Sequence, residues 1–230
     1  MRFWLYKKKV TPRRGNTSSQ KAKEFKRDDL ITLIQAAKAM PSKWAMPSVV
    51  WLAANSIVGL RPIEWKTAYL DVIDGERMLV VVNAKNTNGR SHGKLRHLNL
   101  TKINEAELSL ILKQLNIASR YNIDDATWAR YYSAVRLTIY HMTRTALSNR
   151  RKYPTLYSTR HQFAANAKAA DLGKSEIAAM MGHAVDTTAT MHYGRKKQGT
   201  GRFGVYPAAD EVLRIKVRSK QEFSYKSTMG

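Results

Sequence analysis

The stretch SVVWLAANSIVGLRPIEW, residues 48–65, fixes the centre of the expected fold. Residues 48–58 are apolar on nearly every side, which predicts a helix buried in the middle of a core. Gly59 suits a helix end in the left-handed conformation, and Pro62 suits the first turn of a short new helix. The cation Arg61 and the carboxylate of Glu64 flank this proline, so an internal ion pair is one interpretation of these two residues.

Helical patterns surround this stretch and enclose one region with a strand pattern. Helices are expected from Asp28 or Asp29 onward and over residues 103–119, 124–148 and 159–193, the last interrupted by glycines. Residues 78–82 and 95–100 have the composition and alternation of two strands, joined by a turn with a basic tip. The expected fold class is therefore α+β, mainly helical, with the helices around one small antiparallel sheet.

The charge of the chain points to a polyanionic partner. Its 230 residues include 40 Lys and Arg against 17 Asp and Glu, a formal net charge of +23. So many positive charges repel one another in a folded chain, so binding to a nucleic acid is the expected reason for them. The hydrophobic residues, 43% of the chain, suffice for a core. The chain has no cysteine, which excludes disulfides, thiolate metal sites and cysteine nucleophiles. The longest apolar run, residues 49–54, is too short to span a bilayer, so we expect a soluble intracellular protein.

Both ends of the chain are basic and are expected to lie outside the main domain. Residues 1–27 hold ten Lys and Arg against one acid, which predicts a mobile arm that either follows a phosphate backbone or merely aids solubility. Residues 28–195 are expected to form the main domain. Residues 196–230 form a basic tail, and a short amphipathic helix within 207–217 either docks on a neighbouring protomer or folds back on its own domain.

Four separated segments carry candidate chemistry, and their order is more specific than any one of them. They are GLRPIEW at 59–65, NAKNT at 83–87, YSTRHQFA at 157–164, and MGH at 181–183 followed by HYG at 192–194. In this order they resemble the catalytic domain of the tyrosine recombinase (phage integrase) family over residues 28–195. That family shows G-x-R-x-x-E, a hairpin Lys, H-x-x-R-H-x-F-A, a Gly-His pair and then a Tyr. The resemblance implies a tyrosine-recombinase-like catalytic domain.

The resemblance gives a role to each matching residue. Tyr193 would be the nucleophile, in a cationic setting that favours phenolate. Arg61, Arg160 and His183 would bind the scissile phosphate, because guanidinium groups can stand in for a metal. Lys85 would protonate the leaving oxygen, with Glu64 and His161 in supporting positions. Each also has a plainer interpretation: salt-bridged arginines, a solvated lysine at a turn, a capping histidine or a surface tyrosine.

Two features depart from the family pattern. Tyr157 stands where the family usually has His, three residues before the second Arg, and a phenol is a poor base at neutral pH. The residue that takes the proton from Tyr193 is therefore open between Tyr157 and its near neighbour His161. Tyr193 follows His183 by ten positions, one more than the family pattern leads us to expect.

The implied activity is cutting and rejoining of DNA through a 3′-phosphotyrosyl intermediate, for integration or excision of a mobile DNA element. The resemblance implies no cofactor and no metal, and a homotetramer on double-stranded DNA in the cytoplasm of a bacterium or a phage-infected cell, associated with the nucleoid. The expected DNA-binding residues are Lys7, Lys8, Lys9, Arg13, Arg14, Arg90, Lys94, Arg195, Lys196 and Lys197.

Other classes of function compete with this one. A catalytically silent DNA-binding protein of the same fold, a type IB topoisomerase-like enzyme and a helix-turn-helix regulator all suit the charge. The regulator does not explain the ordered Arg, Lys, Arg, His and Tyr. The family normally carries an N-terminal helical DNA-binding domain, and about 27 residues are too few to build one. We therefore expect either a catalytic-domain fragment or a minimal form.

Overall fold

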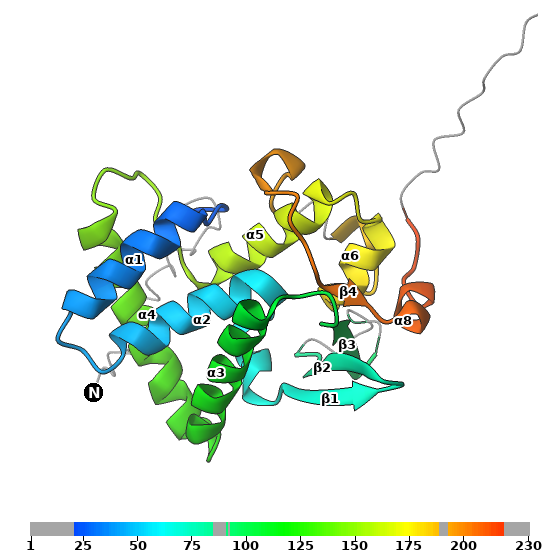
Figure 1. Cartoon of the computed structure of the whole chain (residues 1–230), viewed down its shortest axis with the longest axis horizontal. Coiled ribbons are helices and arrows are strands. Elements are labelled where there is room, and N and C mark those ends of the chain that lie inside the picture. The colour runs from blue at the N-terminus through cyan, green and yellow to red at the C-terminus, as the bar shows by residue number, and fades with distance from the viewer. Residues whose placement is uncertain (1–20, 85–90, 92, 189–192, 219–230) are drawn as a thin grey trace, which may run out of the picture.

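The computed structural model describes residues 21–84, 91, 93–188 and 193–218 of the chain. Its helices are α1 (Arg27–Ala39), α2 (Ala45–Val58), α3 (Glu105–Tyr121), α4 (Asp125–Ala146), α5 (Leu156–Ala169), α6 (Lys174–Met180) and α8 (Ala209–Leu213), with short 3-10 turns η2 (Pro62–Lys66) and η3 (Lys196–Gln198). Its strands are β1 (Tyr69–Ile73), β2 (Glu76–Val82), β3 (Leu95–Asn99) and β4 (Tyr206–Pro207). The fold class expected from the sequence is confirmed: helices around one small antiparallel sheet (Figure 1). No helix in these described ranges is long and apolar enough to cross a membrane.

Helix α2 lies at the centre, as its all-round apolar sequence predicts. Trp51, Leu52 and Ala54 are completely buried. The helix ends at Gly59, which has a φ of 63° and donates its backbone N–H to the carbonyl oxygen of Asn55. A Cβ atom at Gly59 would lie 2.3 Å from the Phe163 ring, so both the backbone conformation and the packing require glycine here.

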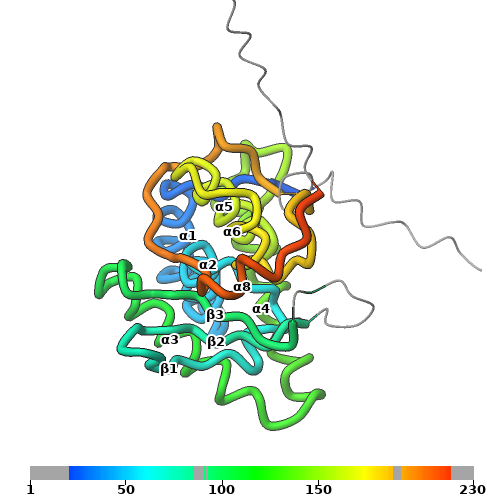
Figure 2. The backbone as a smooth tube through the Cα atoms, turned by 90° about the vertical axis from the view of Figure 1, so that its right-hand side faces the viewer, coloured from blue at the N-terminus to red at the C-terminus, as the bar shows by residue number. Residues whose placement is uncertain are grey.

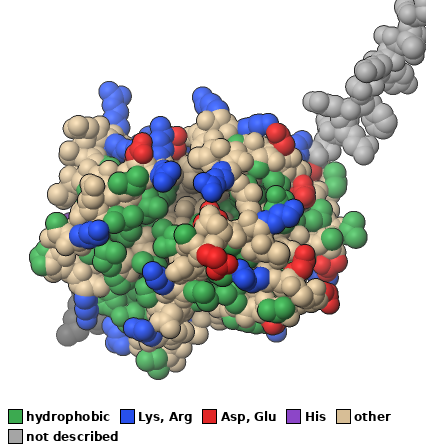
Figure 3. All heavy atoms as spheres, viewed as in Figure 1, with side chains coloured by type: hydrophobic (Ala, Val, Ile, Leu, Met, Phe, Trp, Pro, Cys, Tyr) green, Lys and Arg blue, Asp and Glu red, His purple; other side chains and the backbone are tan. Residues whose placement is uncertain are grey.

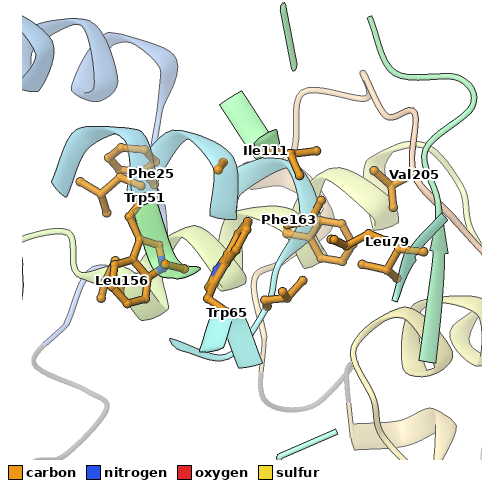
Figure 4. Close-up of a cluster of buried hydrophobic side chains, with 14 of the residues drawn as sticks. Phe25, Trp51, Trp65, Leu79, Ile111, Leu156, Phe163 and Val205 are labelled. Carbon is orange, nitrogen blue, oxygen red and sulfur yellow. The ribbon is translucent and has the colours of Figure 1, made fainter. Parts of the chain in front are cut away.

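The core brings α2 and α5 together with the sheet and the short turn η2. Figure 4 shows Trp65 between Trp51 and Leu156 on one side and Phe163 on the other. The Trp65 indole N–H donates to Asn55 Oδ1 at 2.8 Å, so this large side chain is buried without losing its hydrogen bond. This packing fixes the turn that carries Arg61 against the first half of α5.

The sheet is antiparallel in the order β1-β2-β3-β4. The predicted hairpin of β2 and β3 is confirmed, with Leu79 opposite Leu98 and Val81 opposite Arg96. The edge strands β1 and β4 were not expected from the sequence. Strand β4 has only two residues, one of them a proline, and such a short segment gives no alternation to detect. Figure 2 shows the sheet in the lower half of the view, with α5 and α6 above it.

The folded body extends beyond the predicted limits at residues 28 and 195. Ala22 donates its backbone N–H to the Tyr153 carbonyl at 3.3 Å, and Phe25 is 4% exposed within the core. At the other end, β4 pairs with β3, and α8 places Glu211 against the sheet. Residues 21–27 are therefore packed rather than part of a mobile arm. The C-terminal helix α8 is shorter than the expected range 207–217.

Candidate active site

Glu64 holds two arginine side chains at the junction of α2 and the sheet. Its Oε1 accepts from Arg61 Nη1 at 2.6 Å and its Oε2 from Arg96 Nη2 at 2.7 Å. The internal ion pair of Arg61 and Glu64 is thus present, and the same carboxylate pairs with a second cation, Arg96. Sequence reasoning missed Arg96, although it alternates with the buried Leu98 and Leu100 and so shares their inward face.

The carboxylate of Glu64 is ionised although it is almost completely buried. Burial by itself would raise the pKa of Glu64, but the charge of Arg96 opposes it, followed by those of Arg160 and Arg61. The net result is a pKa well below the ordinary value for a glutamate. Because Glu64 stays charged, the site keeps a fixed anion that orients Arg61 and Arg96.

Arg160 joins three of the four segments singled out in the sequence. It is completely buried and donates through Nη1 to the Gly59 carbonyl and through Nη2 to the Met181 carbonyl, the latter at 2.6 Å. Its Nε lies 3.4 Å from the hydroxyl oxygen of Tyr193. Helix α5 carries Arg160 in its second turn, so the helix brings the guanidinium between the end of α2 and the end of α6.

Tyr193 lies against this arginine and between two histidines. The centroid of its ring is 5.3 Å from that of His183 and 5.1 Å from that of His161. Lys168 fixes the following backbone by donating from Nζ to the Gly194 carbonyl at 2.8 Å. The extra residue between His183 and Tyr193 therefore does not keep these side chains apart.

His183 is neutral and offers one ring N–H. It is 4% exposed, and burial, followed by the charges of Arg160, Arg61 and Arg96, lowers its pKa to about 2. Its Nε2 lies 3.5 Å from Arg160 Nη2. An arginine can only donate, so Nε2 is the acceptor and the proton is on Nδ1. Within the described part of the chain, Nδ1 has no hydrogen-bond partner.

The two candidates for proton acceptor differ in their surroundings. Burial, followed by the charges of Lys23, Arg160 and Lys168, lowers the pKa of His161 to about 4, so this ring is neutral near pH 7. Tyr157 is 41% exposed at the start of α5. The pKa of Tyr132 is raised, mainly by burial, and the nearby phenol of Tyr157 contributes to this rise. Of the two, His161 is the one whose ring lies beside Tyr193.

The buried His183 makes the stability of the protein depend on pH. Its pKa in the folded state is lowered below the unfolded value of about 6.5, so the unfolded chain binds more protons below that pH. We expect stability to be full above about pH 6.5 and to fall by up to about 1.4 kcal/mol per pH unit below it. Urea denaturation of the wild type and of His183→Gln, between pH 5 and 8, measures this. The variant should show a shallower slope below pH 6.5, and equal slopes would contradict the assignment.

The remaining expected site residues are spread over the chain. Lys85, Arg90 and the arm residues Lys7, Lys8, Lys9, Arg13 and Arg14 lie outside the described residues. Lys94, Arg195, Lys196 and Lys197 are exposed, and Lys196 pairs with Asp171. In the ranges that the structure covers, no three His, Asp or Glu side chains gather in a way that could hold a metal ion.

Comparison with known proteins identifies relatives by fold. The sequence matches no protein-family model and no curated protein sequence. Among solved structures, it resembles the XerH site-specific recombinase bound to its difH substrate before cleavage, with a TM-score of 0.50 and 13% identity over 74% of this chain. The same recombinase bound to a palindromic difH substrate after cleavage gives a TM-score of 0.51 and 13% identity over 79% of this chain.

The likeness covers part of those recombinases. The match spans 50% of the pre-cleavage chain and 52% of the post-cleavage chain, so this chain corresponds to about half of their length. At 13% identity the comparison shows a shared fold. The chain therefore shares its fold with the XerH site-specific recombinase, and this agrees with the fold class expected from the sequence.

Proposed function

We propose that the protein is a DNA strand transferase in which Tyr193 attacks a backbone phosphate. The observation that carries this proposal is the contact of Arg160 Nε with the Tyr193 hydroxyl at 3.4 Å. A buried guanidinium beside a phenol favours the phenolate and also draws an anionic phosphate to the same point.

The cations of the site suit the transition state of phosphoryl transfer. Attack on a phosphodiester places extra negative charge on the non-bridging oxygens, and fixed donors stabilise that charge without rearranging. Arg61, Arg160 and the Nδ1–H of His183 are the donors that we assign to this task. Glu64 acts through the arginines that it orients and does not contact the phosphate.

The covalent step conserves the energy of the phosphodiester. The Tyr193 oxygen forms a bond to phosphorus, the bond from phosphorus to the 5′ oxygen breaks, and the phenol proton leaves to a neighbouring base or to water. Lys85 gives a proton to the departing 5′ oxygen. A 5′ hydroxyl then reverses the step on the same or another strand, which rejoins the DNA. We propose Tyr157 as a further hydrogen-bond donor to the bound DNA beside this site.

The biological setting that we propose follows from the same chemistry. Recombination needs two duplexes and four strands, so four copies of the chain on DNA would each supply one Tyr193. Integration or excision of a mobile element, in a bacterial or phage setting and in the cytoplasm, is the process we assign. Residues 1–20, with six Lys and Arg, would add contacts to the phosphate backbone.

Covalent trapping tests the proposal. The wild-type chain is incubated with labelled duplexes that cover the regions flanking its own gene, and the products are separated on a denaturing gel. We expect a slow, protease-sensitive band, and mass spectrometry of its peptides should place the nucleotide on Tyr193. Salt-sensitive binding without any adduct would overturn the proposal in favour of a silent DNA-binding protein. Relaxation of plasmids of any sequence would instead favour a topoisomerase.

A further inference from the structure

A long segment of the chain carries no negative charge. Residues 126–170 contain eight Lys and Arg and no Asp or Glu. This segment comprises most of α4, the connection to α5 and most of α5 itself. On the face drawn in Figure 3, acidic side chains gather mainly on the right, the side of the sheet and α8. The part of the fold formed by α4, the connection and α5 is therefore positively charged along its sequence, from residue 126 to residue 170.

The exposed face of α4 within this segment combines cations with aromatic rings. Leu137, next to Arg136, is 58% exposed, and Tyr140, one turn from both Arg136 and Arg144, is 50% exposed. The Arg144 guanidinium carbon lies 3.5 Å from the centre of the Tyr140 ring and 4.7 Å from that of Tyr153. The two aromatic rings thus orient the Arg144 guanidinium in the absence of a bound partner.

A small cavity lies between this helix face and the start of α5. It has a volume of about 130 Å³. Its cationic and aromatic lining comprises Lys21, Arg136, Tyr140, Arg144 and Tyr153. None of its lining residues is acidic, and none of its three cations forms a salt bridge within the part of the chain that the structure describes. Arg144 Nη1 donates to the Tyr140 carbonyl at 3.2 Å, which leaves its positive charge without a carboxylate partner. Three cations that no carboxylate neutralises, around a small cavity, suit a single tetrahedral anion.

We infer that this cavity binds one backbone phosphate of duplex DNA, with the exposed face of α4 against the duplex. The inference rests on the proposed function for the identity of the ligand. Leu156 lines the cavity and opens α5, and Arg160 follows four residues later, roughly 6 Å further along the helix axis. A phosphate held here fixes the position of the DNA strand relative to Arg160 and Tyr193. Lys21, Arg136 and Arg144 are therefore positioning residues.

The test measures how DNA affinity depends on salt. The double variant Arg136→Gln, Arg144→Gln removes the site, and Lys113→Gln, Arg120→Gln on α3 removes the same charge elsewhere. We expect the site variant to bind duplex DNA about tenfold more weakly at 0.1 M salt, with a slope of log affinity against log salt reduced by about one. The α3 variant should bind with the wild-type slope. All four side chains are exposed, and thermal melting verifies that each variant is folded.

The other outcomes of this experiment contradict either the inference or the proposed function. Equal losses in the two double variants mean that only bulk charge matters, which overturns the inference, as does a wild type that binds no duplex. A second arm uses inorganic phosphate at millimolar concentration. Protection of the wild type alone from thermal melting, without any difference in DNA binding, would identify a small-anion site instead. Weakened DNA binding by the site variant together with a wild type that forms no covalent adduct would keep this inference and overturn the proposed function.

Discussion

Tyr193→Phe is expected to abolish the covalent protein–DNA adduct while DNA binding stays within about twofold of the wild type. The variant removes a single oxygen, which is the atom assigned to attack phosphorus. That oxygen lies 3.4 Å from Arg160 Nε, and the rest of the ring keeps its packing beside His161 and His183. Denaturing gels of the trapping reaction measure the adduct, and fluorescence anisotropy with a labelled duplex measures binding.

A matched control separates the nucleophile from a general effect of losing a phenol. Tyr69 lies on the edge strand β1 and is 49% exposed, so Tyr69→Phe removes an equivalent hydroxyl away from Arg160. This variant should form adduct at the wild-type rate. Adduct formation by Tyr193→Phe would show that another residue attacks the phosphate and would overturn the assignment.

Glu64→Gln is expected to destabilise the fold by about 3–5 kcal/mol. The carboxylate is 1% exposed and accepts from Arg61 and Arg96. Its neutral amide would leave two buried guanidinium groups without a counter-ion and would turn an N–H₂ donor toward one of them. Urea denaturation at pH 7, followed by circular dichroism, gives the free energy of unfolding.

Glu105→Gln is the matched control for this prediction. Glu105 also pairs with an arginine, but its side chain is 85% exposed and 3.8 Å from Arg77 Nη1. Water screens such a pair, so the change in stability should stay within about 0.5 kcal/mol. A Glu64→Gln variant as stable as the Glu105→Gln variant would show that the buried arginines do not depend on Glu64.

The sequence supplied most of the architecture because its periodicities are local. The all-apolar residues 48–58 predict a central helix, and Gly59 marks its end, where the structure finds a φ of 63°. The alternation over residues 95–100 predicts a strand, and the same alternation contained the signal that Arg96 points inward. A fully buried arginine is exceptional, and Arg96 can be buried because it pairs with Glu64, 32 residues away in the sequence.

The ends of the folded body were less predictable. Phe25 belongs to a basic, polar stretch, and nothing local indicates that α5 would cover it. Strand β4 exists only because β3 offers a free edge to residues that follow more than 100 positions later. Long-range pairing of this kind leaves little trace in the composition of a two-residue segment.

The sequence by itself determined the fold class, the basic character of the chain and the order of its candidate residues, Arg61, Arg160, His183 and Tyr193. The spacing of hydrophobic residues and the content of charged residues can be read directly from the sequence, without a structure. Only the tertiary structure decided that the Arg160 guanidinium meets the Tyr193 hydroxyl, that His183 is held neutral, and that one glutamate serves two arginines. These features arise because segments far apart in the sequence pack together and exclude water from the site. The strength of charge interactions there depends on this burial, which no local sequence pattern predicts.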